Sequence, residues 1–490
     1  MSKKLPFLLQ PVPIYTLVWL RIAVGLLAAF DILGNGIYYH WYLGELNASD
    51  FHFSYFGFEW VKPLPEPFLS LYFIFGFFIG LAVAVGWRFK YTAPTLGVAI
   101  AYLFLIEKAH YLNHAYLFIW ICSILTLTPA WREFSFDVKR NPSNWSPTTP
   151  RWSLWIFPLL MAIVYFYGAI AKINEDWLLR GIPLRMWLEA RADLPVIGPI
   201  ISQEWAGYFM SWGGFLLDLL APFMLLGRRS RWWILGFIFF FHIMNHFIFN
   251  IGIFPYLSLV MTSLFFDPDW PVQVVKWVGK RVPIVDRWRN SWINHIQQSR
   301  VQPIETEQPE SLQDVGASNE TAAQQPTEGG AFSKIWQAHP RYARPIYITL
   351  GVLIFVHCTL PFRHHLFGPN VAWTEEGHRY SWRMMLRTKS GYGHFTLVDK
   401  ETQESRKIYP ANELFPRQAR KMYTHPDMIL EFAHHLAERE AAEGRNVEIY
   451  ADISVRLNDG EYGVFIDPEV DLSQTQWQWF AHKDWVLPPP

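Results

Sequence analysis

Long apolar runs constrain this chain more than any other feature of its sequence. Nine stretches are apolar over lengths close to the ~20 residues that a helix needs to cross the hydrocarbon core of a bilayer. They lie at residues 13–34, 67–87, 92–107, 114–130, 153–172, 205–227, 231–249, 250–266 and 345–361. We therefore predict an α-helical polytopic membrane protein with about nine transmembrane helices, surrounded by the lipid bilayer.

The composition agrees with a chain that has a membrane part and a polar part. Of its 490 residues, 51% are hydrophobic and 17% are charged, yet the mean hydropathy is only +0.09. Lys and Arg balance Asp and Glu at 42 each, which removes the positive field that nucleic-acid binding needs. The two cysteines, Cys122 and Cys358, are far apart and lack the spacing of a zinc or dithiol motif. We therefore expect no nucleic-acid partner, no disulfide scaffold and no zinc site.

Changes in composition divide the chain into four segments. We predict a multi-span membrane domain at 1–270, a cytoplasmic basic segment with a disordered linker at 271–344, a last transmembrane helix at 345–361 and an extracytoplasmic α+β domain at 362–490. The linker follows from a Gln-, Glu-, Pro- and Gly-rich stretch. In the last segment NVEIYADISVRLN alternates like a strand, and PDMILEFAHHLAEREAAEG has the spacing of a helix.

The distribution of Lys and Arg predicts which loops face the cytoplasm. When nine spans are counted, the basic residues of the loops fall on one side: Lys3, Lys4, Arg88, Lys90, Arg132, Lys139, Arg140, Arg151, Arg228, Arg229, Arg231 and those of 276–289. By the positive-inside rule this side is cytoplasmic. We therefore expect a cytoplasmic N-terminus and a C-terminal domain on the opposite, extracytoplasmic side.

Polar and ionisable side chains inside the predicted spans form two groups. Arg21 and Asp31 in the first span are expected to form structural ion pairs with other helices. The second group lies at the extracytoplasmic ends of three spans and comprises Asn113, His114, Lys172, His242, Asn245 and His246. A charged group at the bilayer centre costs about 2.5 kcal/mol or more, so each needs a reason. The sequence predicts one polar pocket near the outer leaflet.

Two interpretations of this pocket stay open on chemistry alone. Lys172 is either a lysine that extends to the membrane interface or a desolvated, neutral amine able to take up a proton. The histidines are either interhelical hydrogen-bonding groups or metal ligands. The fourth and seventh spans hold no carboxylate to complete a metal shell, although Glu175 and Asp176 are close to Lys172 in sequence. We therefore predict a proton-handling pocket without a metal.

Motifs in both parts of the chain resemble one known family. In sequence order they include LRIAVGLLAAFDI, KAHYLNHAYL, VYFYGAIAKINEDW, WGGFLLDLLAPF, FHIMNHFIFNIGIFPYL, HRYSWRMMLR and IYADISVRLNDGEYGVFIDPEVD. Through these motifs the sequence resembles the vitamin K-dependent γ-glutamyl carboxylases, whose membrane part is the HTTM domain. It is similar to short, microbial members of that family.

This resemblance implies a reaction of vitamin K hydroquinone, of the menaquinone or phylloquinone type, with O2 and CO2 as co-substrates. The deprotonated hydroquinone would add O2 and become a strongly basic alkoxide, which removes a γ-proton from a protein glutamate. The carbanion would then capture CO2 while the vitamin leaves as its epoxide. The implied partners are a glutamate-containing protein or peptide and a quinone reductase that supplies the quinol.

The resemblance also implies roles for single residues. Lys172 matches the family's catalytic base, and His114 matches a histidine that assists the carbanion and CO2 step. The residues expected around the cofactor are Asn113, His242, Asn245, Met384 and Met385. The residues expected to bind the substrate are His364, Trp373, Tyr380, Trp382, Arg387 and Lys389.

Several positions depart from the family pattern. The family's histidine and arginine after the paired methionines, which hold the glutamate, are Arg387 and Lys389 here. His246 stands where the family has a small residue, and Ala171 stands where the family has a lysine. No cysteine pair matches the bridge of the animal enzymes, and their propeptide-holding region beyond Trp485 is expected to be missing. Because these departures affect glutamate handling, the alternatives are a quinol epoxidase without carboxylation and, as a third possibility, a transporter with a polar permeation site.

Overall fold

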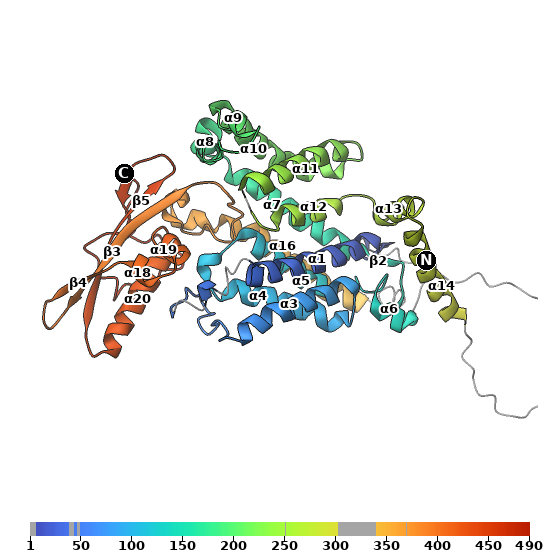
Figure 1. The fold of residues 1–490 in the computed structure, drawn as a ribbon, viewed down its shortest axis with the longest axis horizontal. Helices are drawn as coiled ribbons and strands as arrows, with labels where there is room; N and C mark the ends of the chain where they lie inside the picture. Colours follow the sequence, from blue (N-terminus) through green and yellow to red (C-terminus); the bar gives the residue numbers. More distant parts are fainter. Residues whose placement is uncertain (1–5, 39–43, 47–49, 250, 302–339, 369) are drawn as a thin grey trace, which may run out of the picture.

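The structure, a computed structural model, describes residues 6–38, 44–46, 50–249, 251–301, 340–368 and 370–490. Figure 1 shows a body of helices with a sheet-containing domain at one end, formed by the last part of the chain. The predicted disordered linker lies almost entirely outside the described residues.

Each of the nine predicted runs forms a helix. They are α1 (Tyr15–Leu33), α3 (Phe68–Val85), α4 (Phe89–Leu105), α5 (Asn113–Thr126), α7 (Arg151–Ala171), α10 (Glu204–Leu226), α11 (Ser230–Phe249), α12 (Phe254–Ser263) and α16 (Pro340–Thr359). Among the described residues, six helices are long and apolar enough to cross a membrane: α1, α3, α7, α10, α11 and α16. Helices α4 and α5 are shorter, and α12 has only 10 residues, or about 15 Å. A helical membrane protein is supported, but nine spans are not confirmed.

The short helix α12 still carries the chain from the site described below to the end of the body where α1 begins. Just before α12, a Cβ on Gly252 would lie 4.0 Å from Nε2 of His114. Just after it, the backbone N and Oγ1 of Thr16 both donate to the carbonyl O of Pro268, at 3.1 and 2.6 Å. The strands β1 (Pro11–Pro13) and β2 (Thr148–Pro150) pair next to the start of α1.

Helices α1 and α3 pack so closely that only glycine fits where they cross. A Cβ on Gly25 would lie 2.5 Å from the backbone N of Ala84, and one on Gly80 would lie 2.7 Å from that of Ala29. Small residues let membrane helices approach in this way. Arg21 is fully buried nearby and donates to the carbonyl oxygens of residues 84, 130, 133 and 134. It therefore bridges segments through backbone carbonyls, where the sequence suggested an ion pair.

Shorter helices frame the ends of the body. They are α6 (Phe136–Arg140), α8 (Ile182–Glu189), α9 (Gly198–Ile201), α13 (Trp270–Gly279) and α14 (Pro283–Val301). The first part of the predicted basic segment forms helices α13 and α14. Trp292 on α14 donates from Nε1 to Oε1 of Glu133 at 2.8 Å, so α14 is attached to the helical body.

The C-terminal domain is an antiparallel sheet with a helix packed against it. Its strands are β3 (Lys389–Asp399), β4 (Ser405–Ile408), β5 (Val447–Leu457) and β6 (Tyr462–Val464), in the order β4-β3-β5-β6. The register pairs Phe395 with Ala451, and both are fully buried. The helices are α17 (Val371–Thr374), α18 (Pro410–Glu413), α19 (Pro416–Met422) and α20 (Pro426–Ala442), of which α20 covers the buried face of β5. This arrangement agrees with the predicted α+β domain.

Polar contacts attach this domain to loops of the helical body. The Nζ of Lys108, on the turn Lys108–His110, lies 2.9 Å from Asp427 and 2.7 Å from Glu431 on α20. Gln418 on α19 donates to Oε2 of Glu107 at 2.8 Å. Because both contacts join α19 and α20 to the start of the loop before α5, they position the C-terminal domain over one end of the helices.

Candidate active site

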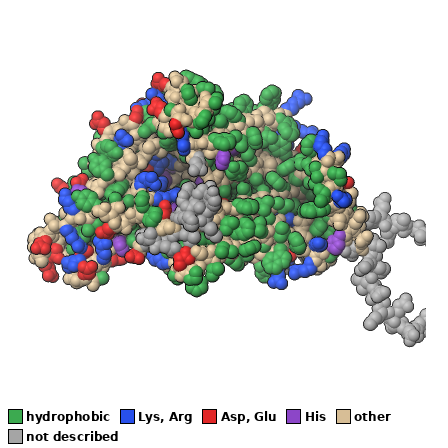
Figure 2. All heavy atoms as spheres, viewed as in Figure 1, with side chains coloured by type: hydrophobic (Ala, Val, Ile, Leu, Met, Phe, Trp, Pro, Cys, Tyr) green, Lys and Arg blue, Asp and Glu red, His purple; other side chains and the backbone are tan. Residues whose placement is uncertain are grey.

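One cavity of about 770 Å³ lies where the helical body meets the C-terminal domain. Its wall comes from α4, α5, α7, α8, α10 and α11, and from residues 375–389 and α19 of the C-terminal part. Figure 2 shows Lys and Arg side chains gathered in a hollow of the surface at this junction. The cavity is lined by these residues predicted for a site: Asn113, His114, Lys172, His242, Asn245, Met384, Met385, Arg387 and Lys389.

Lys172 directly follows the last residue of α7 and is only 7% exposed. Its Nζ donates to Oδ2 of Asp218 at 2.6 Å and to the carbonyl O of Gly168 at 3.2 Å. Nζ also lies 5.5 Å from the centre of the Trp177 ring. The amine is thus held inside the cavity wall by a carboxylate, a carbonyl and an aromatic face, which is not the arrangement of a lysine that extends to the membrane interface.

Asp218 is a functional candidate that the sequence interpretation missed. It lies on α10 and is as buried as Lys172. A carboxylate inside the apolar run WGGFLLDLLAPF is an ionisable group in a predicted span, and this signal alone could have identified it. Gly168 leaves the space that the carboxylate occupies, because a Cβ there would lie 2.9 Å from Oδ2 of Asp218.

Asn113 and His114 are the first residues of α5 and line the same cavity. Oδ1 of Asn113 accepts a hydrogen bond from the hydroxyl of Tyr111 at 3.0 Å, which fixes the orientation of the amide. The centre of the His114 ring lies 5.8 Å from that of Phe254, the first residue of α12. The starts of α5 and α12 therefore form one wall of the site.

His242 on α11 is 1% exposed, and neither ring nitrogen has a hydrogen-bonding partner in the part of the chain that the structure describes. Asn245, about one turn further along α11, also lines the cavity. Buried polar groups are nearly always satisfied, so an unpaired imidazole at a cavity indicates a polar ligand. His246, predicted on the same helix face, contacts Tyr256 and does not line the cavity.

Met384 and Met385 provide an apolar part of the cavity wall, and methionine adapts its shape to flexible apolar ligands. The backbone leading to them is strained: Tyr380, Trp382 and Met385 have φ values of 63°, 56° and 52°, each costing about 1 kcal/mol. Packing holds this conformation, because Trp382 is 1% exposed and the backbone N of Tyr380 donates to the hydroxyl of Tyr111 at 2.6 Å.

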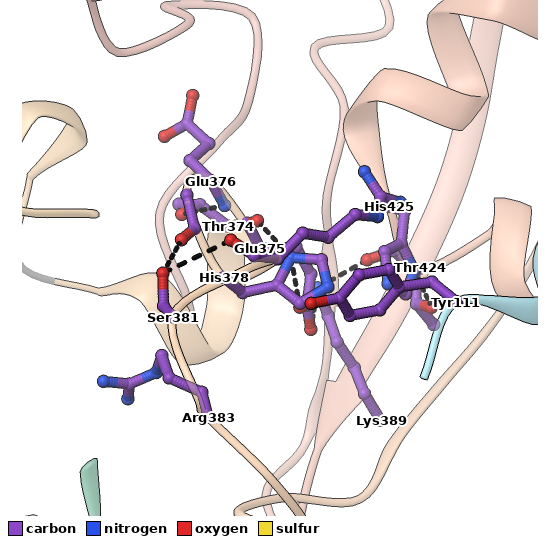
Figure 3. Close-up of polar contacts among 12 residues, drawn as sticks. Tyr111, Thr374, Glu375, Glu376, His378, Ser381, Arg383, Lys389, Thr424 and His425 are labelled. Carbon is purple, nitrogen blue, oxygen red and sulfur yellow. Dashed lines mark hydrogen bonds and ion pairs between the residues drawn. The ribbon is translucent and has the colours of Figure 1, made fainter. Parts of the chain in front are cut away.

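The end of the cavity at the C-terminal domain is rich in cations. Figure 3 shows Glu375, His378 and His425 close together, with Lys389 beside them. Arg387 binds both carboxylate oxygens of Glu375, and Nζ of Lys389 lies 3.8 Å from the same carboxylate. Burial lowers the pKa of Arg387 to about 10, and burial with the nearby Arg387 charge lowers the pKa of Lys389 well below its usual value. Arg387 and Lys389, which are both predicted to bind the substrate, therefore already share the carboxylate of Glu375.

Glu375, His378 and His425 also place three ligand atoms within 4.8 Å of one another. The Nδ1 atoms are engaged, however: that of His378 lies 2.6 Å from the carbonyl O of Glu375, and that of His425 lies 2.8 Å from the carbonyl O of Lys421. Burial, followed by nearby positive charges, holds the pKa of both histidines well below its usual value. The same positive charges disfavour a metal cation, so the absence of a metal stays our prediction.

Four residues predicted to bind the substrate do not line the cavity. Trp373 belongs to the core of the C-terminal domain, and Trp382 packs in the core of the helical body. Tyr380 packs against the same core, and Nδ1 of His364 lies 2.8 Å from a carbonyl of its own turn. These positions support the cavity wall and the domain core, and direct contact with a substrate stays a prediction for all four.

Comparison with known proteins gives two matches that agree with this arrangement. The HTTM domain matches residues 9–270, and the lumenal domain of vitamin K-dependent gamma-carboxylase matches residues 342–490. No solved structure matches the chain. Together with the six apolar helices, the second match indicates a membrane protein with a lumenal C-terminal domain. Because the two matches together cover the helical body and the sheet domain, the chain belongs to the vitamin K-dependent gamma-carboxylase family.

Proposed function

We propose that this protein is a vitamin K-dependent γ-glutamyl carboxylase, which oxygenates vitamin K hydroquinone and uses the strong base that results to carboxylate a protein glutamate. The family supports an enzyme of this type. The observation that carries the specific proposal is a single cavity with the Lys172–Asp218 pair at its membrane end and cationic residues at its lumenal end. Such a cavity suits a lipid-soluble quinol and a water-soluble peptide that must react with each other.

The membrane end of the cavity fits a quinol head group. Its wall contains apolar side chains such as Phe241 and Met384, and an unpaired ring nitrogen of His242 offers a hydrogen bond that one hydroxyl of a hydroquinone can satisfy. When bound, the hydroquinone supplies the reaction with O2 that generates the strong base and ends in the epoxide. A quinone reductase in the same membrane must then renew the quinol.

Lys172 would act as the base that takes the first quinol proton. An amine can accept a proton only while it is neutral, and Asp218, 2.6 Å from Nζ, can hold the proton that Lys172 would otherwise carry. Asp218 is therefore a positioning residue that orients Lys172 and exchanges a proton with it.

Among the described residues, Arg383 has no ion-pair partner and is available for the substrate glutamate, whereas Arg387 is already bound to Glu375. The Arg383 side chain lines the cavity, and its buried Nε has no hydrogen-bonding partner among the described residues. The amide of Asn113 lies 3.5 Å from the Arg383 carbonyl O, so Arg383 is next to the start of α5. A glutamate held there would react beside His114, whose ring would stabilise the charge that develops during CO2 addition.

A quinol epoxidase without carboxylation is the alternative function. One observation favours it: Arg387 and Lys389, at the positions where the family holds glutamate, are both engaged with Glu375. A transporter is less well supported, because a permeation site gives no reason for a lumenal domain that provides part of the cavity wall.

The test supplies the purified protein in nanodiscs with reduced vitamin K, O2, labelled bicarbonate and a glutamate peptide, and it measures epoxide and fixed label separately. We expect both products, and a peptide with Gln in place of Glu should give no fixed label. Epoxide without label would replace the carboxylase by the epoxidase. The absence of both products would reject both enzymes.

A further inference from the structure

Helix α19 carries three basic side chains that line the cavity: Arg417, Arg420 and Lys421. Their spacing of i, i+3 and i+4 places them on one face of the helix. Within the described part of the chain, no carboxylate lies at ion-pairing distance from any of the three. We call these three residues the α19 ridge.

Two other cations near the ridge, Arg379 and Lys108, are in contrast balanced by two carboxylates. Arg379 binds Asp427 at 2.6 Å, and Lys108 binds Glu431 at 2.7 Å. These paired charges hold the C-terminal domain on the helical body and leave little net field. The ridge adds three unbalanced positive charges to the cavity wall, and such a concave basic surface attracts anions.

Helix α19 is fixed in its place over the cavity by Gln418, which is 2% exposed. Its Oε1 accepts a hydrogen bond from the backbone N of Phe415 at 3.0 Å, and its Nε2 donates to Phe51 O at 2.9 Å and to Glu107 at 2.8 Å. Burial, followed by the neighbouring guanidinium groups, lowers the pKa of Lys421 to about 8. The anchored helix therefore keeps like charges together that would otherwise move apart.

We infer that the α19 ridge binds a second carboxylate of the peptide substrate, next in sequence to the glutamate that reacts. This inference rests on the proposed function and adds a preference for peptides with adjacent acidic residues. Arg383 would hold the reacting carboxylate, and the ridge would bind its neighbour through charge-assisted hydrogen bonds, which are stronger than neutral ones.

The experiment measures binding and requires no turnover. Two fluorescent peptides differ at one position: one contains Glu-Glu, and the other contains Gln-Glu with the reacting glutamate alone. Their affinities for the full-length protein in nanodiscs are compared by fluorescence anisotropy. We expect the wild type to bind the Glu-Glu peptide about tenfold more tightly. The double variant Arg417→Gln, Lys421→Gln should lose most of this ratio and bind the Gln-Glu peptide as before.

Two control variants separate charge from folding. Lys407→Gln removes an exposed cation on β4 that does not line the cavity, and it should keep the ratio. Arg417→Lys with Lys421→Arg preserves both charges and should also keep it. An equal affinity of the wild type for both peptides, or an unchanged ratio in the double Gln variant, would overturn the inference. If bicarbonate alone competes with both peptides and lowers their affinities equally, the ridge binds hydrogen carbonate. This result would also overturn the inference.

The comparison of the two affinities and the activity test can each fail without the other. A protein that makes neither epoxide nor carboxylated peptide rejects the proposed function, whatever the ratio of affinities. A protein that carboxylates both peptides with the same affinity keeps the proposed function and rejects the role of the α19 ridge.

Discussion

The two ends of the cavity differ in how their charges are balanced. At the membrane end, Lys172 and Asp218 form a pair at 2.6 Å within a largely apolar wall, to which Asp31 of α1 contributes a second carboxylate. At the lumenal end, Glu375 is the one carboxylate that the described residues of the C-terminal part contribute to the lining. The basic side chains that line the same end of the cavity are Arg383, Arg387, Lys389, Arg417, Arg420 and Lys421. A balanced pair can exchange a proton without creating net charge, whereas an unbalanced set of cations holds an anion.

Two lysines show the same difference at the level of one side chain. Lys108 faces both Asp427 and Glu431, and these carboxylates raise its pKa above the usual value although burial alone would lower it. It stays charged and joins the two domains. Lys172 has only Asp218 as a carboxylate partner among the described residues. Two carboxylates thus surround the lysine that joins the two domains, and one carboxylate pairs with the lysine at the membrane end of the cavity.

The largest expected effect comes from removing the amine of the balanced pair. Lys172→Ala should lower epoxide formation by about 1,000-fold or more, because a positioned general base contributes about 100- to 10,000-fold to a rate. Lys172→Arg should fail to a similar extent, because its guanidinium can still pair with Asp218 but does not give up its proton. Epoxide yield is measured by chromatography on protein that elutes as a single species.

The two Lys172 variants test whether the side chain acts as a base or only as a positive charge. If Lys172→Arg keeps most of the activity, a permanent positive charge is sufficient and the amine is not a base. If Lys172→Ala forms epoxide at the rate of the wild type, Lys172 has no part in the mechanism. The melting temperature of each variant in detergent serves as the control for folding.

Removing the carboxylate of the same pair should have a smaller effect. Asp218→Asn keeps the shape of the side chain but cannot accept a proton, so we expect epoxide formation to fall by about 100-fold. Asp218→Glu keeps the carboxylate and should recover part of the rate. The measurement is the pH profile of epoxide formation, which should change form in Asp218→Asn. A uniform loss in Asp218→Asn and Asp218→Glu, with the wild-type pH profile, would show that Asp218 acts only through packing.

The membrane end of the cavity was predictable because polar residues are conspicuous in apolar runs. Asn113, His114, Lys172 and His242 all emerged from this contrast, and the structure places them around one cavity. Asp218 carries the same signal, because it is an ionisable residue inside the apolar run WGGFLLDLLAPF. The predicted helices likewise follow from apolar length, although α12 has only 10 residues.

The lumenal end was not predictable in the same way, because charged residues are ordinary in a soluble domain. Arg387 and Lys389 were noticed through the resemblance, yet their pairing with Glu375 depends on the tertiary fold. The basic residues of α19 have no sequence pattern that separates them from a solvated helix face. Trp373 and Trp382 became core residues because large aromatic side chains bury the most apolar area.

A third prediction sharpens the comparison at the boundary between the two ends. His114→Ala should reduce carboxylation about tenfold more than epoxide formation, because the histidine would act only after the strong base has formed. The ratio of fixed label to epoxide in the same reaction measures this directly. His246→Ala, which changes a histidine outside the cavity lining, is the matched control. An equal loss of both products would reject the assignment of His114 to the second step.

The smallest expected effect concerns the pH dependence of peptide binding at the lumenal end of the cavity. The pKa of Lys421 is lowered to about 8, so its ammonium group is charged below this pH and loses its charge as the pH rises through 8. The affinity for a Glu-Glu peptide should therefore fall about threefold between pH 7 and pH 9. A loss of this size corresponds to the free energy that one partly exposed ion pair contributes. Lys421→Arg stays charged over this range and should remove the decline, whereas the same decline in Lys421→Arg would assign it to another group. A Gln-Glu peptide should show no decline in either protein, because the charge of the α19 ridge matters only when a second carboxylate is present.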